Sequence, residues 1–311
     1  MMQPQAGRAI VIAGPTASGK SQLASALAER LGGVIINADS MQVYRELTVL
    51  TARPQPDELA RLPHALYGFV SGAEAYSAGR YGRDAAGAIA AARCARRRPI
   101  IVGGTGLYLR ALLEGLSPVP AADPAVRAYW RQQAGQYPAR ELHALLGARD
   151  PIMAARLKPT DPQRIVRALE VLDSTGRSLA DWQRQPGRPV LEARETIPVL
   201  LLPPPAGHGA AIAQRFRRML AEGALEEVRA LLGLGLSGEL PIMRALGVAA
   251  LAQHLAGRQS LEAAAAAAEL ETRQYAKRQM TWFRRNMISW KTFQTKEMER
   301  TMAEILAFIQ P

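Results

Sequence analysis

The chain has 311 residues, of which 48% are hydrophobic, so it can bury a substantial core as one large domain or two smaller ones. Its net charge of +12 favours an anionic macromolecular partner, nucleic acid first, with surface charge for solubility as the alternative. A single cysteine excludes a disulfide framework, and no stretch approaches the roughly 18 apolar residues that span a bilayer, so we expect a cytoplasmic protein without membrane contact.

A phosphate-binding loop is predicted near the N-terminus. The apolar run of residues 9–13 is typical of a buried strand, and the segment AGPTASGKS that ends the run contains the G-x-x-x-x-G-K-[ST] pattern. Leucines and alanines at helical spacing then predict a helix from Lys20 to Leu31. In such a loop the backbone N–H groups point at an anion, the lysine reaches its outer oxygens, and the Ser21 hydroxyl holds Mg²⁺ as cofactor. We expect the phosphate or diphosphate of a ligand to bind at Gly14, Pro15, Thr16, Ala17, Ser18, Gly19, Lys20 and Ser21.

Further apolar runs predict the rest of an α/β fold. Residues 34–37 form a second strand, a strand follows Pro99, and residues 196–205 form another, with a helix over 76–98 between them. Strands that alternate with helices indicate a parallel sheet with helices on both faces, and ligands bind such sheets at the carboxyl ends of the strands. The phosphate-binding loop and the residues that follow the next two strands should therefore meet at one edge.

Two chemical groups are expected at that edge. Asp39 directly follows the second strand, where it can act as a general base or as a Mg²⁺ ligand, or can simply cap a turn. The GGTG turn at residues 103–106 lets the backbone approach a ligand closely, and Thr105 adds a hydroxyl; a plain turn between strand and helix is the alternative.

The chain between residues 118 and 190 shows no strand pattern, and it predicts a helical insertion between an α/β core of residues 1–117 and its completion in residues 191–311. Within the insertion, Arg164 and Arg167 lie one helical turn apart. They can clamp phosphates, contact nucleic acid or serve as surface charge, and the spacing does not choose among these roles.

A basic segment lies near the C-terminus, where a long helix is predicted over residues 261–286. From Thr272 to Lys291 the chain has six cations, no acid and several aromatic residues. Arg273, Lys277 and Arg284 share one helical face. Positive charge for a backbone and rings for stacking favour RNA contact, and a solvated helix face with inward-packed rings is the alternative.

Five segments together resemble the bacterial tRNA dimethylallyltransferases, also called tRNA isopentenyltransferases. They are GPTASGKS, NADSMQVYREL, VGGTGLYLRALLEGL, DPQRIVRALEVLDSTGRSL and TRQYAKRQMTWFRRN, in the family's order from residue 14 to residue 286. The resemblance implies transfer of a dimethylallyl group from dimethylallyl diphosphate to the exocyclic N6 amine of the adenosine 3′-adjacent to the anticodon. The substrates are tRNAs that read codons starting with U, and the products are N6-isopentenyladenosine and diphosphate. We expect a monomer.

The resemblance also implies roles for individual residues. Asp39 matches the general base, Thr105 matches a threonine beside the reacting adenine and diphosphate, and Arg244 in PIMRALG matches an arginine near the diphosphate. The positions that match tRNA contacts are Asp39, Ser40, Met41, Gln42, Thr105, Arg127, Gln163, Arg164, Ile165, Val166, Arg167, Lys277, Arg278, Gln279, Met280, Thr281, Trp282, Phe283 and Arg284.

The chemistry of the residues agrees with this reaction and leaves two rivals. An adenine amine is a poor nucleophile, and a positioned carboxylate that takes its proton contributes roughly 10²–10⁴-fold. Loop amides and cations stabilise the charge that grows on departing diphosphate, and the target base has to leave its stack. Two rival hypotheses remain. One is a nucleoside or small-molecule kinase with Asp39 as base, and the other is a non-catalytic RNA-binding module with a vestigial phosphate-binding loop.

Overall fold

The computed structural model describes residues 7–294 and 298–309, and the chain forms two compact units. The first unit combines the chain up to Leu113 with the chain from Val190 onward, and the second unit is Glu114–Pro189. Among the described residues, no helix is both long and apolar enough to cross a membrane.

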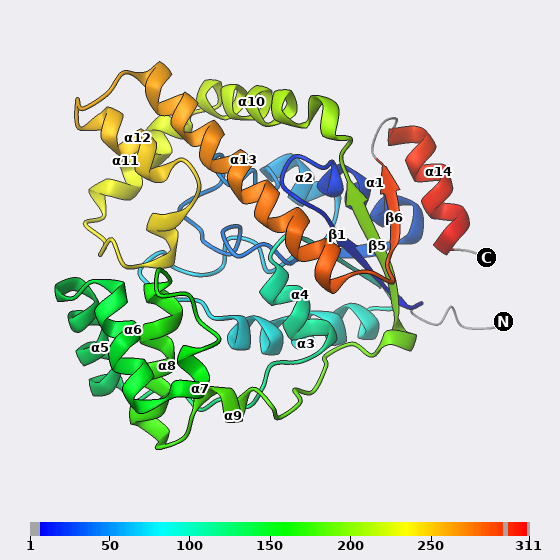
Figure 1. Ribbon diagram of the computed structural model, residues 1–311. Helices are drawn as coiled ribbons and strands as arrows, with labels where there is room; N and C mark the ends of the chain where they lie inside the picture. The colour runs from blue at the N-terminus through cyan, green and yellow to red at the C-terminus, as the bar shows by residue number, and fades with distance from the viewer. Residues whose placement is uncertain (1–6, 295–297, 310–311) are drawn as a thin grey trace. The chain divides into compact units, whose positions relative to one another are not determined.

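The first unit contains a six-stranded sheet in the order β3-β2-β4-β1-β5-β6, in which every neighbouring pair is parallel (Figure 1). Its strands are β1 (Ala9–Ala13), β2 (Gly33–Asn37), β3 (His64–Ala65), β4 (Arg98–Gly103), β5 (Thr196–Leu202) and β6 (Lys291–Gln294). In the central register Ile10 pairs with Ile100 on one side and with Ile197 on the other. The predicted parallel α/β architecture is confirmed.

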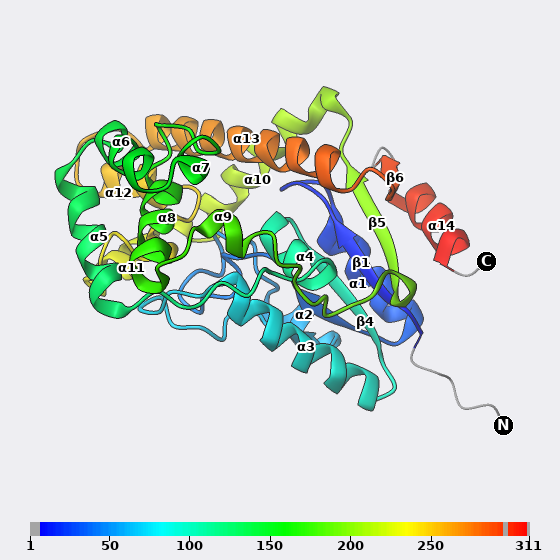
Figure 2. The same cartoon turned by 60° about the horizontal axis from the view of Figure 1, so that its bottom comes forward.

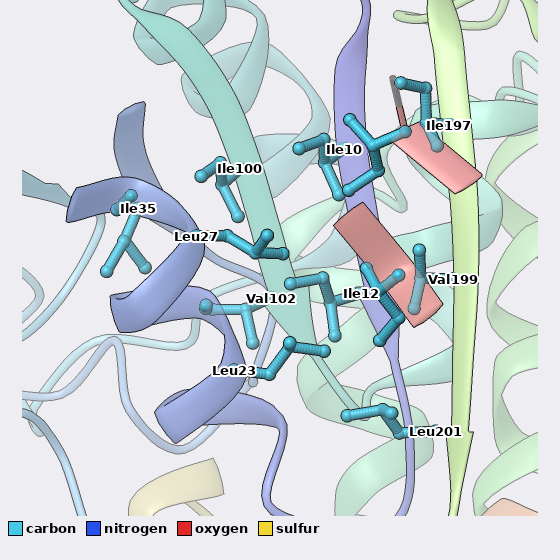
Figure 3. Close-up of a cluster of buried hydrophobic side chains, with 14 of the residues drawn as sticks. Ile10, Ile12, Leu23, Leu27, Ile35, Ile100, Val102, Ile197, Val199 and Leu201 are labelled. Carbon is cyan, nitrogen blue, oxygen red and sulfur yellow. The ribbon is translucent and has the colours of Figure 1, made fainter. Parts of the chain in front are cut away.

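Helices cover both faces of this sheet. On one face, α1 (Lys20–Leu31) and α14 (Met298–Ile309) close a core to which every strand except β3 contributes. Figure 3 shows Leu23 and Leu27 of α1 lying against Ile12 and Val102 of the central strands. On the opposite face α3 (Ala78–Cys94) packs against β2 and β4. Each fully buried side chain of this size contributes about 1.5–3 kcal/mol to folding.

The remaining helices of the first unit include α13, whose predicted bounds are confirmed and whose start is capped by the Ser260 hydroxyl. This helix packs alongside α10 and α12, as Figures 1 and 2 show for α10. The helices are α2 (Pro56–Arg61), α4 (Gly106–Leu113), α10 (Pro205–Ala221, with non-helical residues at Ala206 and Gly207), α11 (Ala224–Gly233), α12 (Val248–Leu255) and α13 (Leu261–Asn286). Two short 3-10 helices, η1 (Ala193–Glu195) and η2 (Pro241–Arg244), complete it.

The helices of the second unit are its only regular elements among the described residues. The sequence predicts this insertion at residues 118–190. The helices are α5 (Pro124–Gln136), α6 (Ala139–Arg149), α7 (Pro151–Ala154), α8 (Pro162–Thr175) and α9 (Leu179–Trp182). Their core surrounds Trp130, whose Nε1 donates to Asp173 Oδ2 at 2.8 Å, and Asp173 also pairs with Arg149. The side chains of Ile165 and Val166 in α8 are buried in this core, and the predicted contact of this segment with tRNA stays a prediction.

The two edge strands are not predicted from the sequence. Strand β3 has two residues, too few for a period to show. Strand β6 exposes three of its four side chains, as short polar edge strands do, and among the described strands it pairs only with β5. Each of these segments is a strand because it pairs with a neighbouring strand of the sheet, and the local sequence does not show that pairing.

Candidate active site

Three loops meet at the carboxyl edge of the sheet because β1, β4 and β2 are neighbours. The Ala38 N–H donates to the carbonyl of Val102 at 2.8 Å, and the Thr105 N–H donates to the carbonyl of Ala38 at 3.3 Å. The Ser40 N–H donates to Thr105 Oγ1 at 2.9 Å. A Cβ on Gly104 would lie 2.9 Å from the Gly14 carbonyl oxygen, so the glycine-rich loop also approaches the GGTG turn closely. The predicted convergence of the three loops is therefore confirmed.

Two glycines are required for this close approach. A Cβ on Gly103 would lie 2.1 Å from the Ala38 carbonyl oxygen, and a Cβ on Gly14 would lie 2.7 Å from the Leu201 carbonyl oxygen. Since both obstacles are backbone atoms, neither can move aside without displacing a strand. The glycines of the two turns thus bring the backbones into contact.

The glycine-rich loop runs from β1 into the first turn of α1. Ala17 and Gly19 have left-handed φ values of 58° and 80°, which fold the loop over the helix N-terminus. Lys20 Nζ donates to the Pro15 carbonyl at 3.1 Å. The Ser18 hydroxyl is buried, and it has no hydrogen-bond partner among the residues that the structure describes. A concave loop at a helix N-terminus is built like an anion-binding site.

Burial lowers the pKa of Lys20 to about 8, and it is the largest influence on that lysine. The charge of Asp39 opposes this shift and raises the pKa, while the charge of Arg215 lowers it further. Asp39 and Arg215 therefore lie close enough to Lys20 for their charges to shift its pKa. A bound anion would favour the charged lysine.

Asp39 is held at the end of β2 by the buried Asn37. The Asp39 N–H donates to Asn37 Oδ1 at 2.8 Å, and Asn37 Nδ2 donates to the Asp39 carbonyl at 2.9 Å and to the Leu66 carbonyl at 3.0 Å. Asp39 Oδ1 accepts the Met41 N–H at 2.9 Å. The bond at Oδ1 orients the carboxylate. Within the described part of the chain Oδ2 accepts no hydrogen bond, so this oxygen is free to take a proton.

A cavity of about 280 Å³ joins this carboxylate to the loop. Its polar lining includes Thr16, Asp39 and Arg215. Its apolar lining consists of Ala17, Met41, Leu50, Ile212, Phe216, Met219, Ala245 and Leu246. A cavity lined by both charged and apolar side chains suits a ligand with an anionic head and a short hydrocarbon tail.

Arg215 is a site residue that sequence reasoning missed. Its Nη1 donates to Thr16 Oγ1 at 3.2 Å, beside the loop. His208, from the same helix, places Nε2 2.9 Å from the Thr16 carbonyl oxygen. Burial lowers the pKa of Arg215, but an arginine stays charged at neutral pH. The one signal in the sequence that could have suggested this residue is its position in the amphipathic pattern of α10, and many surface arginines occupy similar positions.

Arg244 and Tyr275 line the same cavity. Arg244 Nη2 pairs with Glu239 at 2.8 Å, and half of its side chain is exposed, so its predicted place near the diphosphate stays a prediction. Burial and the charge of Asp39 raise the pKa of Tyr275, and a hydrogen bond with the Thr105 side chain lowers it. The phenol therefore stays neutral and links α13 to the GGTG turn.

The basic segment of α13 has an outer and an inner face. Four of its predicted RNA contacts are exposed, namely Lys277, Arg278, Thr281 and Arg284, while Met280 and Trp282 are half-buried. Gln279 and Phe283 are buried, and the predicted RNA contacts of this segment stay predictions. A groove of about 390 Å³ between α10 and α13 is lined by Arg273, Lys277, Arg284 and His208. The predicted sharing of one face by the first three is confirmed.

In the second unit, Arg127, Gln163 and Arg164 are exposed. Arg167 Nη1 pairs with Glu170 at 3.3 Å and Arg164 Nε with Asp161 at 3.4 Å. Their contact with tRNA stays a prediction.

The sheet and its site define a class. A parallel α/β sheet that carries a glycine-rich loop, a helix N-terminus and a free carboxylate at its carboxyl edge is typical of enzymes that handle phosphorylated ligands. A family model described as IPP transferase matches residues 42–286, and a model described as Isopentenyl transferase matches residues 7–66. The chain belongs to the IPP transferase family.

Relatives agree over nearly the whole chain. A protein from Parvibaculum lavamentivorans named tRNA dimethylallyltransferase is 51% identical over 99% of this chain and 98% of its own length. One of the same name from Mesorhizobium japonicum is 50% identical over 96% of this chain and 94% of its own length.

Solved structures agree as well. The tRNA isopentenylpyrophosphate transferase of Bacillus halodurans matches with a TM-score of 0.69 and 30% identity over 97% of this chain and 95% of its own. A eukaryotic dimethylallyltransferase acting on tRNA matches with a TM-score of 0.78 and 26% identity over 97% of this chain and 79% of its own.

Proposed function

We propose that this chain transfers a dimethylallyl group from dimethylallyl diphosphate to N6 of the adenosine 3′-adjacent to the anticodon, in tRNAs that read codons starting with U. The products are N6-isopentenyladenosine and diphosphate. One observation carries the proposal: Asp39, whose Oδ1 accepts the Met41 N–H, lines a cavity that is also lined by Thr16 and Ala17 of the glycine-rich loop and by several apolar side chains. The names of relatives at about half identity over nearly the full chain support the same reaction.

The reaction divides between the two sides of the cavity. Asp39 takes a proton from the N6 amine while the amine nitrogen forms a bond to C1 of the donor. The C1–O bond breaks, and its electron pair leaves with the diphosphate. The oriented carboxylate raises the nucleophilicity of the amine, because the lone pair of adenine is otherwise delocalised into the ring. The apolar wall, which includes Leu50 and Phe216, packs against the five-carbon tail and excludes water from it.

The departing diphosphate is stabilised at the loop. Amides at the start of α1, Lys20 and Arg215 carry the positive charge and dipoles that oppose its growing negative charge. Arg215 is the better candidate for this task than Arg244, because Arg215 bonds to the loop and Arg244 pairs with Glu239. Thr105, whose Oγ1 accepts the N–H of Ser40 next to Asp39, would contact the adenine.

The residues at the loop fit Mg²⁺. Within the described residues no group of three or more His, Cys, Asp or Glu side chains forms a metal cage. Mg²⁺ commonly keeps several waters and binds through one or two protein oxygens plus substrate phosphates. The exposed Ser21 hydroxyl in the first turn of α1 would be its protein ligand. Mg²⁺ would supply charge neutralisation on the diphosphate oxygens.

The RNA would be held by the basic face of α13 and by the exposed residues of the helical insertion. Lys277, Arg278 and Arg284 present charge without a nearby acid in their own segment, which suits a phosphate backbone. The target adenosine would be flipped out of its stack into the cavity. We also propose that the protein is a cytoplasmic monomer.

The test supplies unmodified tRNA with either labelled dimethylallyl diphosphate or labelled ATP. Label from the prenyl donor should enter the RNA, and label from ATP should not; the reverse result would make the protein a kinase. Asp39→Asn keeps the acceptor for the Met41 N–H and removes the base. It should lower transfer by roughly 10²–10⁴-fold with tRNA affinity unchanged, whereas a non-catalytic RNA-binding module would show no transfer in either protein.

A further inference from the structure

Gln279 lies in the most basic segment of the chain, yet its side chain is only 5% exposed. Its neighbours Lys277 and Arg278 point to solvent. A buried amide needs hydrogen-bond partners, and Gln279 finds them in two loops that are far away in the sequence.

The amide joins the glycine-rich loop to the GGTG turn. Gln279 Oε1 accepts the Thr16 N–H at 2.9 Å, and Gln279 Nε2 donates to the Gly104 carbonyl at 2.8 Å. The Thr16 N–H therefore needs an acceptor and the Gly104 carbonyl needs a donor. A neutral amide supplies both, whereas a carboxylate or a hydrocarbon does not. A Cβ on Gly104 would lie 2.3 Å from Nε2, so the turn is pressed against the glutamine.

Both partners belong to the working parts of the site. Thr16 directly precedes Ala17, whose φ of 58° is a left-handed conformation that is unfavourable for an alanine and persists only when the surroundings hold it. Gly104 directly precedes Thr105, which bonds to the Ser40 amide next to Asp39. The Gln279 side chain thus bonds to both the glycine-rich loop and the GGTG turn beside Asp39.

We propose that Gln279 is a positioning residue for the donor site: it holds the glycine-rich loop in its anion-binding shape and in register with the Thr105 turn. The proposal rests on the assignment of the loop to the diphosphate. It also gives α13 two tasks, because its outer face carries the cations and its inner face braces the loop.

The experiment measures the affinity of inorganic diphosphate by calorimetry, together with KM for the prenyl donor and Kd for tRNA. Gln279→Met keeps the length of the side chain and removes both hydrogen bonds. We expect diphosphate affinity to fall and donor KM to rise by roughly 10- to 100-fold, with Kd for tRNA unchanged. Gln274→Met, at an exposed position of the same helix, should change none of the three.

A second variant tests the orientation of the amide. Gln279→Glu keeps the acceptor for the Thr16 N–H but sets a carboxylate against the Gly104 carbonyl. Its diphosphate affinity relative to wild type should be low at pH 8 and recover toward pH 5.5, because the protonated acid can donate.

Two results would overturn the proposal. One is a rise in Kd for tRNA with diphosphate affinity unchanged, which would make Gln279 an RNA contact. The other is a loss of thermal stability in Gln279→Met without a selective loss of diphosphate affinity in the folded protein. Diphosphate binding is measured without transfer, so a wild-type protein that transfers no prenyl group would refute the proposed reaction and leave this measurement intact.

Discussion

Glu227 should hold one wall of the cavity in place. Its Oε1 accepts the N–H groups of Thr48 and Val49 at 2.5 and 2.9 Å, and its Oε2 accepts the N–H of Leu50 at 2.8 Å. Leu50 is 6% exposed and lines the cavity. The loop that follows β2 therefore depends on a carboxylate from α11, and Glu227→Ala removes three hydrogen bonds at once.

The magnitude follows from these contacts. A hydrogen bond to a charged group contributes about 1.5–3 kcal/mol net, so three bonds set an upper limit of roughly 5–9 kcal/mol. Glu227 is half-buried, and water replaces part of this loss. We expect Glu227→Ala to lower the free energy of unfolding by about 2–4 kcal/mol, which for a chain of 311 residues lowers Tm by roughly 3–6 °C.

The matched control is the neighbouring Glu226, whose side chain is 66% exposed and whose Oε1 lies 3.9 Å from Arg229 Nη1. Glu226→Ala should change stability by less than about 0.5 kcal/mol. Thermal unfolding, amide hydrogen exchange at Thr48, Val49 and Leu50, and KM for the prenyl donor form the assay. Equal Tm values for the two variants, or unchanged exchange at the three amides in Glu227→Ala, would refute the reasoning.

Three further predictions concern the charged groups of the site. The pKa of Lys20, lowered to about 8, means that diphosphate affinity should fall as pH rises above 8, by up to about tenfold per pH unit, because only the charged lysine attracts the anion. Calorimetry between pH 7 and 9.5 checks this, and Lys20→Met should bind weakly without that slope. Arg215→Met should raise KM for the prenyl donor by roughly 10- to 100-fold in steady-state assays with tRNA affinity unchanged; an unchanged KM would exclude contact with the diphosphate. Lys277→Ala and Arg284→Ala should each weaken tRNA binding and reduce its salt dependence by about one counterion, whereas Arg300→Ala on α14 should not. Equal salt slopes for all three variants would argue against α13 as the RNA contact.

Local patterns in the sequence determined the elements that carry the site. Strand β1, the glycine-rich loop and α1 follow from an apolar run, spaced glycines and helical periodicity, all within about 20 residues. The bounds of α13 also follow, because its alanine tract has high helix propensity and Ser260 caps its start. The meeting of Asp39 with the GGTG turn is predictable too, since parallel strands present their carboxyl ends at one edge.

Only the tertiary structure decided which distant residues complete the site. Gln279 bonds to Thr16 across 263 positions, and Glu227 bonds to Thr48 across 179. Arg215 reaches the loop from 199 positions away. Neither helical periodicity nor the family motif that contains Gln279 shows which loop such a residue contacts, because the local sequence of a helix does not reveal whether a given face meets solvent or another loop. The inward direction of Gln279 within a basic segment depends on the packing of α13 in the folded chain, and packing is a property of the whole fold.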